Sequence, residues 1–95
     1  MNIPDPPNNF TERQSIYWYQ LCHYMIDKGV SYKDEKLSRI ENLAWALGKY
    51  YQLKGKQDVK EFENLIRVEL QSIPISKEDI EKYKLPDVLR KYVKN

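Results

Sequence analysis

Apolar residues recur along most of this chain at steps of three and four, the spacing that places side chains on one face of an α-helix. Three stretches carry this pattern, at about 12–28, 32–54 and 59–73. No stretch has the alternation of apolar and polar residues that is typical of a half-buried strand. The pattern predicts an all-α fold, a small helical bundle of three main helices plus one or two short C-terminal helices.

Start and stop signals flank each predicted helix. Thr11 and Gln14 have the spacing of a capping box, in which each side chain bonds the backbone N–H of the other. Later caps are expected at Ser31, Asp58 and Ser76, and the main helices are expected to end near Gly29, Gly55 and Pro74. Pro86 favours the start of a last short helix. Ala44 and Gly48 lie one turn apart, so another helix could approach closely there.

The order of these signals divides the chain into three segments: an extended proline-rich arm at 1–9, a helical core domain at 10–75 and a short basic helical tail at 76–95. Pro4, Pro6 and Pro7 keep the arm out of helical backbone space. Two interpretations of the arm stay open. It is either a disordered tail or an arm that packs on a neighbouring subunit.

The first predicted helix has more apolar and aromatic side chains than one buried face needs. The side chains that we assign to an oligomer or partner interface are Tyr17, Trp18, Tyr19, Tyr24 and Ile26. Proteins seldom leave so contiguous an apolar patch in water. The pattern therefore predicts a homo-oligomer that forms through residues 16–26.

Composition narrows the class of protein. Hydrophobic residues make up 41% of the chain and aromatic residues 13%, which is too apolar for a disordered protein. The single cysteine, Cys22, excludes an internal disulfide and a thiolate zinc cluster, and suits a reducing compartment. No apolar run approaches the roughly 20 residues of a membrane span. We expect a cytoplasmic protein with no membrane association.

Candidate catalytic residues are few. His23 and Asp27 lie one turn apart and could form half of a metal site, but no second histidine or nucleophile can be placed beside them from spacing. A histidine that is ion-paired with Asp27 is the favoured interpretation. Most carboxylates stand in first turns, where the helix dipole accounts for them. The sequence predicts no enzyme, no cofactor and no metal.

Basic residues gather at two places although the net charge is only +2. Residues 49–60 hold four lysines and one aspartate, and residues 82–95 hold five basic residues and one aspartate. We assign nucleic-acid binding to Lys49, Lys54, Lys56, Lys60, Lys82, Lys84, Arg90 and Lys91. Clusters of this kind can neutralise phosphates of double-stranded DNA. Each cluster could instead be an ordinary solvated helix end, and the central one a plain hinge.

The order of signals in residues 6–53 resembles the front half of phage terminase small subunits. The shared elements are a proline-rich arm, a helix with adjacent aromatic residues, a "MIDKGV" step and a second helix with "LSRIENLA". The resemblance implies a non-catalytic, ring-forming helical protein of the host cell cytoplasm. It implies that this protein binds viral DNA at the start of packaging and passes it to the large terminase subunit.

A second interpretation remains open. The chain could be a small phage-type or plasmid-type helical protein that binds another protein and inhibits or adapts it. Its many tyrosines suit that role, because tyrosine is enriched at protein interfaces.

Overall fold

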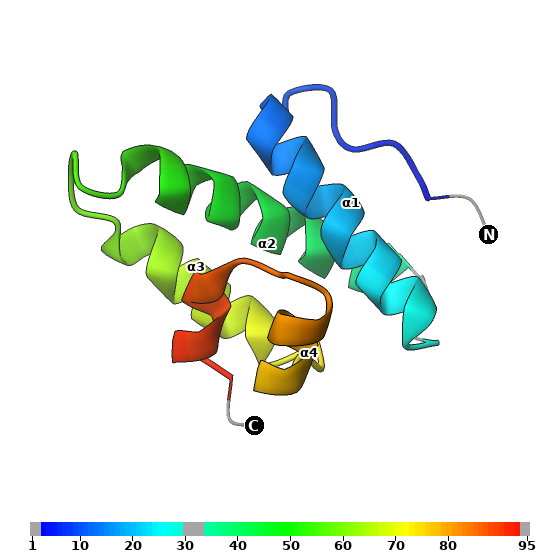
Figure 1. The fold of residues 1–95 in the computed structure, drawn as a ribbon. Helices are drawn as coiled ribbons and strands as arrows, with labels where there is room; N and C mark the ends of the chain where they lie inside the picture. The colour runs from blue at the N-terminus through cyan, green and yellow to red at the C-terminus, as the bar shows by residue number, and fades with distance from the viewer. Residues whose placement is uncertain (1–2, 30–33, 94–95) are drawn as a thin grey trace.

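The computed structural model describes residues 3–29 and 34–93. Its elements are α1 (Glu12–Asp27), α2 (Asp34–Leu53), α3 (Lys60–Leu70), α4 (Lys77–Lys82) and the 3₁₀ helix η1 (Asp87–Lys91) (Figure 1). No strand occurs in these ranges. The predicted all-α bundle of three main helices and two short terminal ones is therefore confirmed.

The predicted capping box starts α1. The backbone N–H of Thr11 donates to Gln14 Oε1 at 2.9 Å, and the N–H of Gln14 donates to Thr11 Oγ1 at 3.2 Å. The helix ends where expected, and Gly29 takes the left-handed backbone with φ of +73°. The predicted cap at Ser31 lies outside the described residues.

The first turn of α1 lies against α2 at Gly48, which confirms the predicted close approach. Figure 1 shows α1 packed across α2. A Cβ atom added to Gly48 would lie 2.2 Å from Cγ of Gln14. The Gln14 side chain is buried there, and its Nε2 donates to the carbonyl of Trp45 at 3.1 Å. One glutamine thus caps α1 and also joins it to α2.

Helices α2 and α3 form an antiparallel hairpin (Figure 1). Trp45 packs edge-on against Phe62, with 5.6 Å between ring centroids, and Arg39 pairs with Glu69 at 3.5 Å. The third helix is shorter than the pattern predicts. It stops at Leu70, because the next two N–H groups bond three residues back in a tight turn.

The segment after α3 is packed into the core rather than appended to it. Ile80, Leu85, Val88 and Leu89 are buried in the same apolar cluster as the main helices. Ser76 caps α4 as expected, and together with Asp79 it forms a capping box. The final short helix after Pro86 is a 3₁₀ helix. The predicted tail from residue 76 is thus structurally part of the core domain up to residue 93.

The described part of the N-terminal arm covers Trp18 of its own chain. Trp18 Nε1 donates to the carbonyl of Pro4 at 2.9 Å, and Phe10 stands edge-on to the indole with 6.3 Å between ring centroids. Ile3 also packs against the core. These contacts place residues 3–10 of the arm against the core of the same chain.

Candidate nucleic-acid interface

The connection between α2 and α3 is a solvent-exposed corner that carries three lysines, and we call Lys54, Lys56 and Lys60 the lysine corner. Gly55 makes the turn possible with φ of +83°, a backbone conformation that costs other residues about 1 kcal/mol or more. All three lysines are exposed, and no carboxylate lies within ion-pair distance of them in the described ranges.

Asp58 is the one acidic residue of the corner, and part of its charge is engaged locally. Its Oδ1 accepts the backbone N–H of Lys60 at 3.0 Å. The residue therefore lies just before the helix start, as an Asx-type turn, while Val59 occupies the N-cap without a side-chain bond. The N-cap is therefore Val59 rather than the predicted Asp58. Asp58 still accepts a backbone N–H at the start of the helix.

Aromatic rings flank the corner. Lys49 Nζ lies 5.9 Å from the centroid of the Trp45 ring, and Lys54 Nζ lies 5.8 Å from that of Tyr50. A cation over an aromatic face is held weakly at an exposed site. These contacts orient the two ammonium groups, and neither group pairs with a carboxylate in the part of the chain that the structure describes.

The basic residues predicted in the C-terminal segment differ from the lysine corner, because two of them are ion-paired. Arg90 Nε lies 3.4 Å from Asp87, and Lys91 Nζ lies 3.4 Å from Glu63 on α3. Both pairs are exposed on the cationic side, so solvent screens them. Lys84 has a left-handed backbone with φ of 54°, and Lys82 lies over the Tyr83 ring.

The structure divides these basic residues between two regions. The η1 helix lies beside the C-terminal half of α2, because the N–H of Val88 donates to the Tyr51 hydroxyl at 3.0 Å. Helix α4 lies near the far end of α1, well away from the α2–α3 connection (Figure 1). Lys82 and Lys84 therefore do not join the lysine corner in one surface.

The residues assigned to an oligomer interface separate into buried and exposed groups. Trp18 is 2% exposed and Tyr24 is 0% exposed, so both belong to the chain's own core. Their assignment to an interface is wrong, because the arm covers one and the segment before α4 covers the other. Tyr17 is half-buried against Tyr51.

An outer stripe of α1 remains exposed. We define it as Ile16, Tyr19 and His23, which are exposed, together with Ile26, which is half-buried. Ile16 is 49% exposed and Tyr19 is 39% exposed. The predicted ion pair of His23 with Asp27 is absent from the described contacts, because Asp27 accepts the Tyr83 hydroxyl instead. No group of three potential metal ligands occurs in the described ranges.

A buried polar cluster joins α1 to the start of α4. Asp79 accepts the N–H of Ser76 at 3.1 Å and the hydroxyl of Tyr24 at 2.9 Å, and pairs with Lys28 at 3.2 Å. Burial by itself would raise the pKa of Asp79, but these hydrogen bonds outweigh it and lower that pKa below the ordinary 3.8. Burial also raises the pKa of Tyr24 far above its usual value.

Beside this cluster, a hydrogen bond to Asp27 raises the pKa of Tyr83 to about 12. Each polar group of the cluster is satisfied by another, so the cluster has the properties of a structural junction. Its members lie far apart in the sequence, and helical periodicity carries no signal for it.

Comparison of the chain with protein-family models, with curated proteins and with solved structures found no match. None of the described helices is both long and apolar enough to cross a bilayer.

Proposed function

We propose that this protein is a non-catalytic, DNA-binding small subunit of a phage packaging terminase, which acts in the host cytoplasm as a homo-oligomer. In this proposal the lysine corner contacts phosphates of double-stranded DNA, and the large terminase subunit is the protein partner. The sequence resemblance supports the assignment to terminases. The observation that carries the DNA-binding part is the set of three exposed lysines, which have no carboxylate partner among the described residues.

The corner suits contacts to phosphates rather than to base edges. Its cations are flexible lysines at a turn, and it presents no arginine fork and no helix face to a groove. Phosphate contacts fix the position of a protein on DNA without reading sequence. The expected binding is therefore strongly salt-dependent and similar across sequences.

The test is a triple change of Lys54, Lys56 and Lys60 to Gln, measured by fluorescence anisotropy on short duplexes at several salt concentrations. The variant should bind more weakly on every sequence, and its salt slope should fall by about 2–3 units. A matched control changes Arg13, Arg67 and Lys77 to Gln, which removes the same charge from exposed positions outside both predicted basic clusters. Equal binding by the corner variant and the parent at low salt would contradict the proposal, as would equal losses in both variants.

A second candidate function is supported by the outer stripe of α1. Exposed Ile16 and Tyr19 give a protein partner apolar surface, so the chain could inhibit or adapt another protein. The same stripe is the remaining candidate for the homo-oligomer contact.

Light scattering over a concentration series separates these possibilities. If the stripe joins copies of the chain, the parent should have the mass of an oligomer, and an Ile16→Ser, Tyr19→Ser variant should approach the monomer mass. A strictly monomeric parent would remove the homo-oligomer from the proposal and favour the second candidate.

A further inference from the structure

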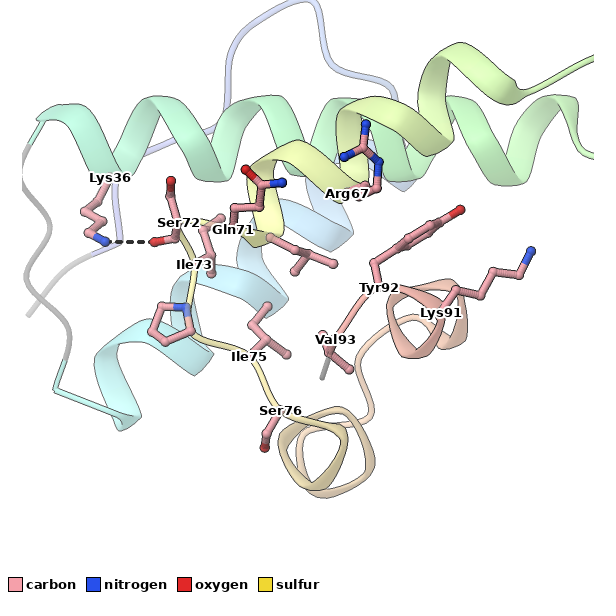
Figure 2. A pocket seen from close by; sticks show the side chains of 12 residues that line it. Lys36, Arg67, Gln71, Ser72, Ile73, Ile75, Ser76, Lys91, Tyr92 and Val93 are labelled. Carbon is pink, nitrogen blue, oxygen red and sulfur yellow. Dashed lines mark hydrogen bonds between the residues drawn. The ribbon is translucent and has the colours of Figure 1, made fainter. Parts of the chain in front are cut away.

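A groove runs along the segment that connects α3 to α4 (Figure 2). Its cavity volume is about 970 Å³. Residues 70–76 form one side, and residues 91–93 lie across from them. Lys36 of α2 is at one end of the view, while Arg67 and Lys91 are toward the other (Figure 2).

The charge of this groove has one sign. Three cations line it, and none of its lining residues is acidic. Lys36 Nζ donates to the carbonyl of Ser72 at 2.9 Å, and no carboxylate among the described side chains pairs with it. Arg67 is exposed and has no ion pair within the described ranges. Glu63 compensates Lys91 and also accepts the Tyr92 hydroxyl at 3.1 Å.

The floor of the groove is apolar. Ile73 and Ile75 are buried beneath it, and Leu70 and Val93 are half-buried at its sides. The main chain of residues 71–76 is irregular, and most of its N–H and C=O groups are bonded within the chain. An occupant therefore meets cations at both ends and apolar side chains between them.

We propose that this groove binds an acidic segment of a partner protein in an extended conformation. Carboxylates of the segment pair with Lys36 and Arg67, and its apolar side chains lie against Leu70 and Val93. An extended peptide alternates its side chains between two faces, so both requirements can be met by one strand. Complementary charge would set the orientation of the segment and speed its association.

The observations favour a peptide over a strand of nucleic acid. Binding of single strands relies on open aromatic faces for base stacking. Tyr92, the one aromatic residue of the lining, is half-buried with its hydroxyl bonded to Glu63. The inference goes beyond the proposed DNA binding, since none of the lysine corner residues lines the groove.

The experiment uses a fluorescein-labelled peptide of alternating glutamate and valine and measures anisotropy with the full chain. Arg67→Glu should weaken binding about tenfold, because it removes one attraction and adds a repulsion. Arg13→Glu is the matched control, as it makes the same charge change on exposed α1 outside this groove. Circular dichroism checks that both variants keep the parent's helix content.

Three further probes complete the test. A lysine–valine peptide should not bind, and Val93→Ser should weaken the glutamate–valine peptide but leave its salt dependence unchanged. The Lys54, Lys56, Lys60 to Gln variant should bind the peptide like the parent, so a failure of DNA binding is separable from a failure here. The proposal is overturned if the peptide does not bind or if Arg67→Glu and Arg13→Glu weaken it equally. It is also overturned if an oligothymidylate binds the groove and loses affinity with Arg67→Glu.

Discussion

An aspartate bonds a backbone N–H at the start of both α3 and α4: Asp58 lies in the connection before α3, and Asp79 lies in the first turn of α4. At the α2–α3 corner, Asp58 is exposed and bonds the N–H of Lys60. At the start of α4, Asp79 is 7% exposed and bonds Ser76, Tyr24 and Lys28. Both aspartates have the sequence spacing of a residue that bonds a helix start. Only Asp79 also has long-range partners, Tyr24 and Lys28, so it should contribute more to the stability of the fold.

Because of this difference, the start of α4 should contribute mainly to the stability of the fold, whereas the corner is available for binding. At the start of α4 the charge of Asp79 is used inside the protein, in bonds to Ser76, Tyr24 and Lys28, so it offers little to a ligand. At the corner the lysines make no ion pair within the described ranges, so their charge is available to a partner. A corner whose side chains are exposed can change its charges with little loss of stability.

The largest predicted effect compares the two aspartates directly. Asp79→Ala should lower the free energy of unfolding by about 3 kcal/mol, because it removes several hydrogen bonds to a buried carboxylate. Asp58→Ala should cost about 0.5–1 kcal/mol, the range of an exposed helix-start bond. Urea unfolding followed by circular dichroism measures both. Equal losses would show that burial does not distinguish the two aspartates.

The local parts of this fold could be predicted from the sequence. The capping boxes at Thr11 and Ser76 and the left-handed turns at Gly29 and Gly55 depend on neighbouring residues, so periodicity and spacing locate them. The lysine corner was predictable for the same reason, since its three lysines are close in sequence.

The long-range contacts could not be predicted in this way. Tyr24 and Asp79 are 55 positions apart, and helical periodicity cannot say that they meet. The same holds for Trp18, which the pattern assigns to an apolar stripe without indicating that the arm covers it. The groove was missed because Lys36 and Arg67 belong to separate helices and form no cluster in the sequence.

The second prediction concerns pH and the same buried aspartate. Because the pKa of Asp79 is below the ordinary 3.8 in the folded chain, its carboxylate stabilises the fold above that pH. This contribution is lost as the pH falls through the lower folded-state pKa. The stability gap between the parent and Asp79→Asn should be about 2 kcal/mol at neutral pH and should close in acid.

Urea unfolding at several pH values measures this gap. Asp58→Asn serves as the control, since its exposed carboxylate lacks the buried partners of Asp79. The interpretation fails if the gap for Asp79→Asn stays constant down to the acid range.

The smallest predicted effect is a loss of stability when Gly55 of the corner is changed, where the new side chain would meet no neighbouring atom. Gly55 has φ of +83°, and nothing lies within 4 Å of a Cβ atom added there. Gly55→Ala should therefore cost about 1 kcal/mol through backbone strain, and Gly55→Asn less, because asparagine tolerates the left-handed region. Lys56→Gln at the neighbouring position should stay within about 0.5 kcal/mol of the parent. If Lys56→Gln destabilises the chain more than Gly55→Ala, the lysine has a structural partner, and its charge is not available for DNA.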